Sequence, residues 1–405
     1  MRTSITNQYL DTSAGEEAER ILRNCVHCGF CNATCPTYLL LGDELDGPRG
    51  RIYLIKNMLE GETPTAKTQL HLDRCLTCRN CETTCPSGVE YGRLLDIGRK
   101  LVTDQVKRSP GQQLFRFMLR KLLLSKKLFS GSLRLGQAFR PVLPRRIQQS
   151  IPLRVSTAHV WPATQHRRKV LLVEGCVQTA LQPDIDKAAA IVFDRIGIQS
   201  LRIKAAGCCG SISHHAEAES ETQAYIKTNI DAWWPAIKSG SIEAITMTAS
   251  GCGVMLKDYA HMLADDPDYA DKAGKISALY KDPCEIITAD DIETGNINAK
   301  YTGKPVAFHP PCTLQHGLKL DGRIEVLLTS LGYELVGFSD KHLCCGSAGT
   351  YSIMQKDLSG KLRDNKLAAI ESAQPELIVT ANIGCQTHLQ GGTAIPVKHW
   401  LELLV

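Results

Sequence analysis

The same arrangement of four cysteines occurs twice near the start of the chain, and it restricts the fold more than any other feature. Each run has the spacing C-x2-C-x2-C-x3-C and is followed by proline: Cys25, Cys28, Cys31 and Cys35 precede Pro36, and Cys75, Cys78, Cys81 and Cys85 precede Pro86. Structural zinc sites usually take their thiolates from two separated C-x2-4-C pairs. Four closely spaced thiolates, present twice, instead favour iron–sulfur clusters.

This spacing is the one that bacterial ferredoxins with two clusters use, and in them the fourth cysteine of each run binds the other cluster. We therefore assign Cys25, Cys28, Cys31 and Cys85 to cluster 1, and Cys75, Cys78, Cys81 and Cys35 to cluster 2. Each proline ends the turn after the crossing cysteine, because it lacks a backbone N–H. Two [4Fe–4S] clusters without an open coordination site predict electron relay rather than substrate chemistry.

Apolar residues at helical spacing accompany the cysteine runs. They occur over residues 52–59, between the runs, and over residues 94–101, after the second run. Residues 1–104 are thus predicted to form a mostly α-helical ferredoxin domain. Arg49 and Arg51 precede the first of these helices. They either lie near the cluster thiolates and raise the reduction potential, or are solvated in a loop.

The chain has 17 cysteines among 405 residues, and this number bears on the compartment. Residues 1–20 lack the apolar segment of a signal peptide, which predicts a cytoplasmic chain. In a reducing compartment, so many cysteines are expected to be metal ligands or catalytic groups rather than disulfides. A composition of 43% hydrophobic and 22% charged residues argues against a disordered or fibrous chain. The apolar runs are too short to predict a membrane span.

A basic connector, assigned to residues 105–168, follows the ferredoxin domain. Residues 105–173 contain no Asp or Glu but 15 Lys and Arg; because the net charge is +5, the remainder of the chain carries −10. Apolar residues interleave with the cations over residues 115–129, as in a basic amphipathic helix. The connector predicts contact with an anionic membrane or a partner subunit, with the acidic remainder of this chain as a third option. Nucleic acid is not expected, because no recognition module accompanies the charge.

The second half of the chain is duplicated. Each copy runs from a strand that ends at a cysteine, through a helix and a short strand, to a Cys-Cys-Gly triplet, and 31 residues separate the first cysteine from the triplet in both. Alternating strands and helices predict α/β units with a parallel sheet. We place the lobes at residues 169–302 and 303–405, related by a pseudo-twofold axis. The expected fold class is α+β and multidomain: an α-helical ferredoxin domain followed by two homologous α/β Cys-Cys-Gly lobes.

Four cysteines of each lobe follow the ends of predicted strands, where open α/β sheets carry their ligand sites. They are Cys176, Cys208, Cys209 and Cys252 in the first lobe, and Cys312, Cys344, Cys345 and Cys385 in the second. These cysteines are candidates for further iron–sulfur centres or for a thiolate site that handles electrons. The alternatives are zinc or redox-inert core cysteines. Cys284 aligns with Leu401 when the repeats are compared, which predicts a core position.

Histidines near the cysteines, and nucleotide-binding motifs, would be further sources of chemistry. His309 and His316 flank Cys312. Near a cysteine site, a histidine is a ligand, a proton relay or, more often, a hydrogen-bond donor to a ligand. The sequence has neither G-x-G-x-x-G at a strand–helix junction nor G-x4-G-K-[ST]. Flavin is therefore expected in another chain.

Several sequence blocks together resemble a known family. They are CVHCGFCNATCPTYLLLGDELDGPRGRIYLIK, LDRCLTCRNCETTCPSGV, NIDAWWPAI, LCCGSAGTY and TANIGCQTHL. The chain is similar in these blocks to the iron–sulfur subunit of bacterial glycolate oxidase, also called glycolate dehydrogenase. The two-part layout also resembles the iron–sulfur subunits of anaerobic glycerol-3-phosphate dehydrogenase and of lactate utilisation, and the cysteine-rich subunit of heterodisulfide reductase.

The resemblance implies a heteromeric complex in which FAD-binding subunits oxidise glycolate to glyoxylate. This chain, without catalytic residues or a flavin of its own, would pass the electrons to a membrane quinone from the cytoplasmic face of the inner membrane. The alternatives are a related 2-hydroxy acid or glycerol-3-phosphate dehydrogenase, and a heterodisulfide-reductase-like thiol/disulfide reductase. In heterodisulfide-reductase-like proteins, the last element of each repeat is C-x2-C. Here Ala249 and Asn382 stand in place of the first cysteine of that pair. This departure argues against an unusual multi-iron cluster, although four thiolates suffice for an ordinary one.

Overall fold

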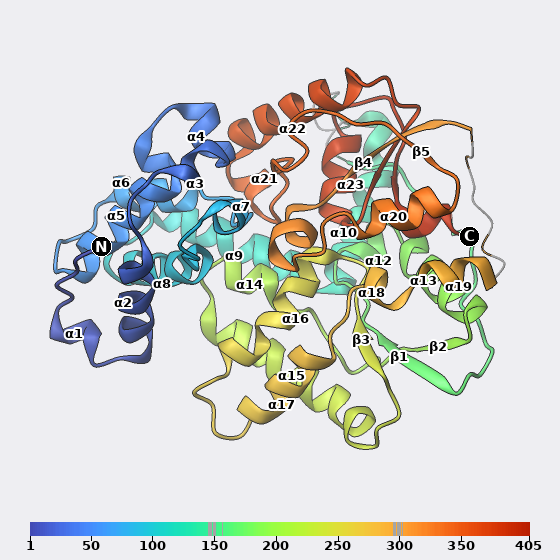
Figure 1. Cartoon of the computed structure of the whole chain (residues 1–405), viewed down its shortest axis with the longest axis horizontal. Helices are drawn as coiled ribbons and strands as arrows, with labels where there is room; N and C mark the ends of the chain where they lie inside the picture. Colours follow the sequence, from blue (N-terminus) through green and yellow to red (C-terminus); the bar gives the residue numbers. More distant parts are fainter. Residues whose placement is uncertain (145–147, 149–150, 156, 295–296, 298–300, 302) are drawn as a thin grey trace. The chain divides into compact units, whose positions relative to one another are not determined.

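A computed structural model describes the chain except for residues 145–147, 149–150, 156, 295–296, 298–300 and 302. The described residues form two compact units: the first comprises residues 1–115 and 340–366, and the second comprises residues 116–339 and 367–405. The expected α+β multidomain class is confirmed, because a helical N-terminal region precedes two parallel sheets (Figure 1). The predicted domain boundaries stay a prediction. Arg145 and Arg146 of the basic connector, and Thr302 at the predicted lobe boundary, lie outside the described residues.

The first unit consists of helices around one apolar core. Its elements are α1 (Asn7–Leu10), α2 (Ser13–Asn24), α3 (Phe30–Ala33), α4 (Pro36–Leu41), η1 (Glu44–Asp46), α5 (Pro48–Leu59), α6 (Ala66–Asp73), α7 (Asn80–Thr84), α8 (Tyr91–Gln105) and α21 (Tyr351–Met354). The two predicted helices are α5 and α8. Ile21, Ile55, Leu72 and Leu94 come from α2, α5, α6 and α8, are fully buried and belong to one cluster. These four helices therefore hold the cysteine loops between them.

Two parallel sheets form the framework of the second unit. The first contains β1 (Arg168–Leu172), β2 (Ile198–Leu201) and β3 (Ala244–Thr246) in the order β2-β1-β3, and the second contains β4 (Pro305–His309), β5 (Glu334–Leu335), β6 (Leu377–Thr380) and β7 (Val397–His399) in the order β5-β4-β6-β7. The first lobe also has α12 (Gln178–Leu181), α13 (Asp184–Arg195), α14 (Ser211–His215), α15 (Glu219–Lys238), α16 (Ser250–Met262), α17 (Ala270–Leu279), α18 (Pro283–Ile286) and α19 (Ala289–Thr294). The second lobe has η3 (Thr313–Gly317), α20 (Arg323–Ser330), α23 (Ile383–Gln390) and η4 (Trp400–Leu403), and α22 (Lys356–Glu371) contributes residues to both units. The predicted duplication of α/β lobes is confirmed.

Strand pairing reproduces the duplication residue by residue. Ile245 of β3 forms a parallel bridge with Tyr280, and Ile378 of β6 pairs with Val397 of β7 in the same way. The residues that follow Tyr280 and Val397 are therefore equivalent, and each segment begins a short helix with a capping box. This equivalence places Cys284 in α18, where it is 4% exposed among apolar side chains. Its predicted core position is confirmed.

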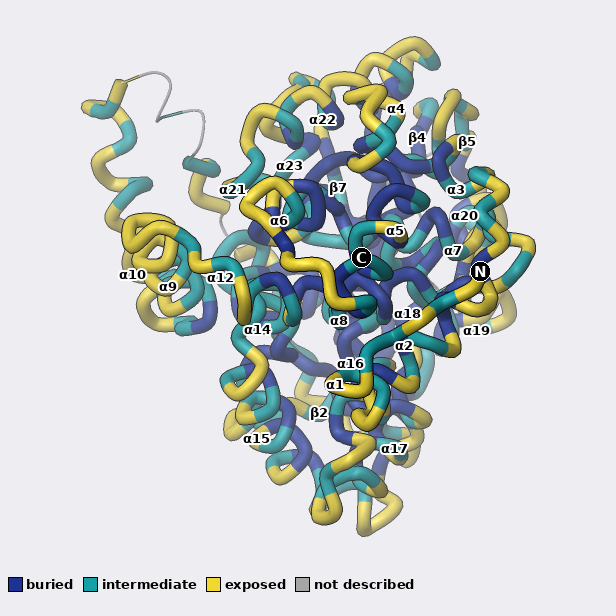
Figure 2. The backbone as a smooth tube through the Cα atoms, turned by 90° about the vertical axis from the view of Figure 1, so that its left-hand side faces the viewer, coloured by how far each residue is buried: buried dark blue, intermediate teal, exposed yellow. Residues whose placement is uncertain are grey.

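Alternate residues of β1 face different cores. Val170 and Leu172 belong to a cluster that also contains Val306 and Val379 of the second sheet, so the two lobes share this core. Leu171 lies instead in the cluster that includes residues of α15 and α16. Strands of parallel sheets are covered on both faces, which explains why β4 is buried beyond its first residue (Figure 2).

The basic connector forms α9 (Pro110–Leu124), α10 (Lys126–Phe139) and η2 (Arg140–Val142). Three cations of α9 pair with acidic residues of the second unit: Arg116 with Glu217 at 3.3 Å, and both Arg120 and Lys121 with Glu221 at 2.5 Å. The third option, contact with acidic residues of the same chain, therefore holds for α9. Among the described helices, none has the length and apolar composition that crossing a membrane requires.

Candidate iron–sulfur sites

Both ferredoxin cysteine loops place left-handed residues at the same two positions. His27 and Gly29 have φ angles of 55° and 84°, and Thr77 and Arg79 have φ angles of 52° and 58°. Non-glycine residues rarely adopt such angles except where the surroundings require them, as at ligand sites. At Gly29 a Cβ would lie 2.7 Å from Nη1 of the flexible Arg49 side chain, which would have to shift to accept it. The two loops thus share left-handed residues at equivalent positions of the two cysteine runs.

The cysteines of the two runs line two cavities of the first unit. Cys25, Cys28, Cys31, Cys81 and Cys85 line one cavity, and Cys35, Cys75, Cys78 and Cys81 line the other. Cys85 of the second run therefore lies with the first run, and Cys35 of the first run lies with the second. The structure brings each expected set of four thiols together, and their role as cluster ligands stays a prediction.

Burial affects the ionisation of these thiols. Burial, with repulsion from the neighbouring thiols of the same set, raises the pKa of Cys31 to about 11. Burial, followed by repulsion from Cys78 and Cys75, also raises the pKa of Cys81. Four thiolates can share such a cavity only if positive charge compensates them. The donor set therefore fits a [4Fe–4S] cluster, whose iron ions supply that charge.

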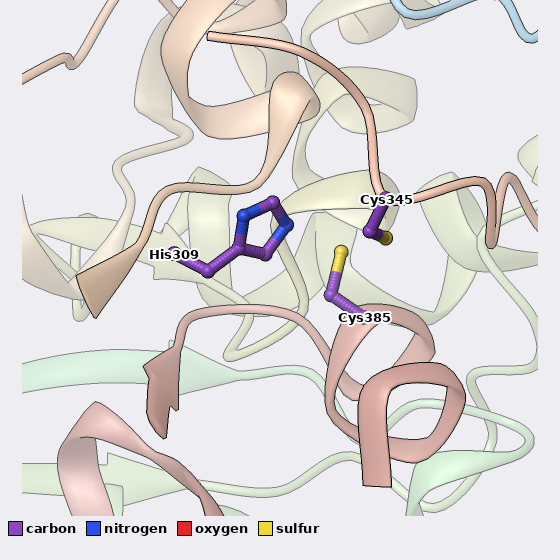
Figure 3. Close-up of side chains that lie close together, drawn as sticks. All are labelled: His309, Cys345 and Cys385. Atoms are coloured by element: carbon purple, nitrogen blue, oxygen red, sulfur yellow. The ribbon is translucent and has the colours of Figure 1, made fainter. Parts of the chain in front are cut away.

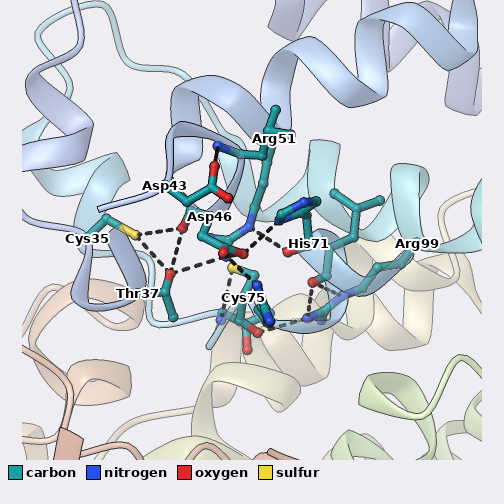
Figure 4. Close-up of polar contacts among 12 residues, drawn as sticks. Cys35, Thr37, Asp43, Asp46, Arg51, His71, Cys75 and Arg99 are labelled. Atoms are coloured by element: carbon teal, nitrogen blue, oxygen red, sulfur yellow. Dashed lines mark hydrogen bonds and ion pairs between the residues drawn. The ribbon is translucent and has the colours of Figure 1, made fainter. Parts of the chain in front are cut away.

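A fully buried arginine lies beside the second cavity (Figure 4). Arg51 of α5 donates from Nε to the His71 carbonyl oxygen at 2.8 Å and from Nη2 to Thr37 Oγ1 at 3.2 Å. Thr37 Oγ1 lies 3.3 Å from Cys35 Sγ. Burial lowers the pKa of Arg51, but the charges of Cys75 and other neighbours outweigh burial and raise it above its usual value. Arg51 therefore stays charged next to two of the thiols.

A buried carboxylate completes this network. Asp46 is 0% exposed and accepts from Arg74 Nη1 at 2.8 Å and from His71 Nδ1 at 3.0 Å, with Arg51 Nη2 at 3.5 Å. Arg49, in contrast, has a side chain that is 38% exposed and pairs with a surface glutamate. Both arginines lie near thiols, because Arg49 lines the first cavity and Arg51 lines the second. Arg49 is the partly solvated one.

The segment that carries the second Cys-Cys-Gly triplet belongs to the first unit. Asn80 of α7 donates from Nδ2 to the carbonyl oxygens of Thr34 at 3.0 Å and His342 at 3.2 Å, so it joins this segment to a ferredoxin loop. Burial raises the pKa of Tyr351, and the charges of Cys75 and Cys344 add to the rise. Tyr351 therefore lies close enough to both Cys75, which lines the second cavity, and Cys344 for their charges to act on it.

The four cysteines of the first lobe converge in the second unit. The Cys208 thiol accepts from Cys176 and Cys209, and Cys209 also contacts Cys252. Accepting these bonds lowers the pKa of Cys208, whereas donating to Cys208 raises the pKa of Cys176 and Cys209. The set comes from the ends of β1 and β3 and from the loop after β2, as expected for an α/β ligand site. Its donors fit a metal ion or an iron–sulfur centre.

Asn229 and Tyr259 hold the first Cys-Cys-Gly loop in place. Asn229 of α15 accepts from Gly207 N–H at 2.7 Å and donates to the Cys208 carbonyl oxygen at 2.7 Å, and Tyr259 of α16 donates to the Cys209 carbonyl oxygen at 2.8 Å. Sequence reasoning missed both residues, because a polar residue within a helix has no pattern of its own. The Asn229 position lies in the NIDAWWPAI block, which was the one available signal.

The glycine after each cysteine pair is required by its conformation. Gly210 and Gly346 have φ angles of 94° and 91°. In this conformation the Gly210 N–H donates to Cys208 Sγ at 3.5 Å, and the Gly346 N–H donates to Cys344 Sγ at 3.4 Å. The duplicated triplets therefore share a local geometry in which a backbone N–H points at the first thiol.

The second lobe differs from the first near its cysteines. A ring nitrogen of His309, at the end of β4, lies within 4.8 Å of Cys385 Sγ in α23 (Figure 3). Asn382 Nδ2 donates a hydrogen bond to the same sulfur at 3.7 Å. Asn382 stands where the C-x2-C pattern has its first cysteine, so a hydrogen-bond donor replaces a thiol at this position. Cys345, also drawn in Figure 3, belongs with Cys344 to the first unit, whereas Cys312 belongs to the second. Convergence of these four cysteines stays a prediction.

Two protein families match the chain. The 4Fe-4S dicluster domain matches residues 21–89, and the cysteine-rich domain matches residues 170–257 and 306–390. With the fold and the cysteine sites, these matches define the class: an iron–sulfur protein in which a two-cluster ferredoxin region precedes a duplicated cysteine-rich domain.

Full-length relatives identify the family within this class. The chain is 50% identical to the glycolate oxidase iron–sulfur subunit of Escherichia coli (strain K12) over 404 residues, which cover 100% of this chain and 98% of the relative. It is 30% identical to the probable glycolate oxidase iron–sulfur subunit of Bacillus subtilis (strain 168), over 92% of this chain and 89% of that one. The chain therefore belongs to the family of glycolate oxidase iron–sulfur subunits.

A solved structure supports the fold alone. The crystal structure of a hypothetical protein from Helicobacter pylori has a TM-score of 0.54 to this chain at 9% sequence identity, and the match covers 98% of this chain and 72% of that one. The similarity shows that the overall architecture occurs in a distant protein.

Proposed function

We propose that the chain is the electron-transfer subunit of a glycolate oxidase complex. FAD-containing partner subunits oxidise glycolate to glyoxylate, and this chain carries the electrons onward to a membrane quinone. The observation that carries the proposal is the convergence of two sets of four thiols in one helical unit. The chain is also 50% identical to the glycolate oxidase iron–sulfur subunit of Escherichia coli. When bound, [4Fe–4S] clusters accept and release single electrons.

The ligand sets that we assign are those of the two cavities. Cys25, Cys28, Cys31 and Cys85 hold cluster 1, and Cys35, Cys75, Cys78 and Cys81 hold cluster 2. Cys81 and Tyr91 line both cavities, which supports an arrangement with the two clusters next to each other. The left-handed residues of the loops orient the first three thiols of each set.

Exposure near the first cavity supports electron entry there. Cys28 is exposed, and the adjacent Val26 and Phe30 are 67% and 60% exposed. Exposed apolar side chains that rim a site are typical of a surface where a partner protein docks. Cys75 and Cys78 of the second set are buried. We therefore assign cluster 1 to receive electrons from the flavin-containing partner.

The charges that act on Tyr351 support the next step of the relay. This buried side chain is influenced by the charges of Cys75 and Cys344. Cluster 2 would thus pass electrons to the Cys-Cys-Gly region. In the first lobe, the set of Cys176, Cys208, Cys209 and Cys252, of which the first three are buried, supports one further centre. The chain works at the cytoplasmic face of the inner membrane, as a peripheral subunit.

The composition of the purified chain tests the ligand assignment. Iron, zinc and acid-labile sulfide are measured per chain after anaerobic purification, with EPR during stepwise reduction. About eight iron atoms fit two [4Fe–4S] clusters, and about twelve or more add redox centres in the Cys-Cys-Gly lobes. Zinc without iron would exclude the relay.

Reconstitution with the flavin-containing partners tests the division of labour. Glycolate should reduce a quinone analogue only when this chain is present, and lactate and glycerol 3-phosphate serve as competing donors. If the isolated chain oxidised glycolate with a dye as acceptor, the assignment of catalysis to the partners would be wrong. If cysteine replacements at Cys208 and Cys209 abolished a disulfide reductase activity of the isolated chain, the thiol/disulfide reductase would be the better description.

A further inference from the structure

Helix α10 exposes an apolar stripe to solvent. Leu128, Leu135 and Phe139 are 57%, 61% and 55% exposed, and Val142 of the following η2 is 78% exposed. These four residues are separated by intervals of seven, four and three residues, and η2 follows α10 directly, so their side chains lie on one helical face. A surface helix of a globular protein normally turns its apolar face to the core. No described residue of α10 is buried, and Figure 2 draws the helix in the colours of intermediate and exposed residues.

Cations border this stripe. Lys127 and Arg134 are exposed and lie seven residues apart, immediately before Leu128 and Leu135. The connector contains no acidic residue, so no carboxylate offsets their charge along the helix. In α9, by contrast, Arg116, Arg120 and Lys121 are engaged by acidic residues of the second unit. Lys127 and Arg134 are therefore exposed cations that flank the apolar stripe of α10.

We propose that α10 and η2 dock on an anionic lipid surface. The helix lies in the interfacial plane, with Leu128, Leu135, Phe139 and Val142 among the acyl chains and with Lys127 and Arg134 at the lipid phosphates. A helix with an apolar face and flanking cations binds membranes in this way, and the negative surface potential of the bilayer attracts the cations. The inference rests on the proposed function in one respect, because electron delivery to a membrane quinone requires contact with the bilayer.

Vesicle binding by the full chain, purified with its clusters, tests the inference. Vesicles of phosphatidylglycerol and phosphatidylcholine in equal parts should sediment the protein, whereas vesicles of phosphatidylcholine alone should not. Salt should weaken the binding. The triple variant Leu128→Ser, Leu135→Ser, Phe139→Ser should lose at least about tenfold in affinity, because it removes most of the inserted apolar surface. Lys127→Gln and Arg134→Gln should each cost about fivefold.

Val326→Ser provides a matched control. Val326 of α20 is 64% exposed, so the substitution removes a comparable apolar side chain away from the connector. It should leave vesicle binding unchanged. Unchanged binding by the triple variant, or equal binding to both kinds of vesicle, would overturn the proposal. Failure of the wild-type chain to bind, combined with loss of the flavin-containing partners from the triple variant, would show that the stripe is a protein interface instead.

The same preparations separate this inference from the proposed function. Electron flow from glycolate to a soluble dye in the reconstituted complex does not require α10. If the wild-type complex showed no electron flow to the dye, the proposed function would be refuted. If electron flow were normal but the chain did not bind vesicles, only membrane docking would be refuted. Iron content and the unfolding midpoint of each variant verify that it is folded and loaded.

Discussion

Replacing Arg51 by methionine should lower the reduction potential of the cluster assigned to Cys35, Cys75, Cys78 and Cys81. The guanidinium is 0% exposed and charged, so it stabilises the more negative, reduced state of a neighbouring cluster. Methionine has a similar length and removes the charge. Asp46 keeps its contacts with Arg74 and His71, so the substitution does not leave a buried carboxylate without a partner.

The structure sets the size of the effect. Two contacts in series, of 3.2 Å from Arg51 Nη2 to Thr37 Oγ1 and of 3.3 Å from Thr37 Oγ1 to Cys35 Sγ, place the guanidinium within about 6.5 Å of that sulfur. At about 8 Å from the centre of the cluster charge, with an effective dielectric constant of about 20, one unit charge contributes about 2 kcal/mol. For a one-electron couple this corresponds to about 90 mV.

An EPR-monitored redox titration of the anaerobically loaded chain measures this shift. Arg51→Lys retains the charge and should shift the potential by less than half as much. Arg49→Met removes a partly exposed charge near the other cavity, where water and salt screen it, and should change either potential by less than about 20 mV. A shift below about 30 mV in Arg51→Met, at full iron content, would refute the electrostatic reasoning.

A second variant, which should shift the reduction potential in the opposite direction, replaces Arg51→Met if that variant loses its cluster. If Arg51→Met does not hold iron, Asp46→Asn is titrated instead. It removes a buried negative charge from the same network, so it should raise the potential of the same cluster. A fall or no change in that variant would contradict a role for the charge of this network.

Three further changes test other parts of the structure. Cys28→Ser should lower the iron content by about four atoms per chain and stop electron flow. Cys284→Ser, in the apolar core, should retain full iron content and electron flow. Retained iron in Cys28→Ser would contradict the ligand assignment. Asn229→Ala should cost about 1–3 kcal/mol in chemical unfolding, because a buried N–H and carbonyl lose their partner, and an unchanged midpoint would show that the Cys-Cys-Gly loop does not depend on it. Burial lowers the pKa of His399 from 6.5 to about 4, so between these values the unfolded chain binds a proton that the folded chain does not. Stability should therefore fall by up to about 3 kcal/mol as the pH drops from about 6.5 to about 4; urea unfolding at pH 7 and pH 5 should show a smaller fall for His399→Gln, and equal falls would refute this cause.

The neutral state of His399 has a structural reason. Its Nε2 lies 2.9 Å from the Thr248 carbonyl oxygen, and its Nδ1 accepts from the Leu401 N–H at 3.3 Å. One ring nitrogen must donate and the other must accept, which is the pattern of the neutral imidazole. A second proton, on Nδ1, would remove the acceptor of the Leu401 N–H, so acid opposes this capping contact within the second lobe.

The sequence by itself determined the class of the protein, because its strongest signals are local. Each cysteine run supplies three ligands within seven residues. Thiols so close along the chain are well placed to bind one common metal centre. The helices α5 and α8 follow from apolar periodicity in the same way. The duplication also placed Cys284, since equivalent positions of a repeat meet equivalent surroundings.

Only the tertiary structure decided which neighbours act on these sites. Arg49 and Arg51 are two residues apart in one helix, yet one is partly solvated and the other is buried beside Thr37 and the thiols. The cations of α9 find Glu217 and Glu221 about a hundred residues away, which charge composition could not distinguish from a membrane or a partner. Long-range pairing depends on how helices pack rather than on spacing along the chain. For that reason the electrostatic surroundings of the clusters, and the face of α10 left to solvent, became visible only in three dimensions.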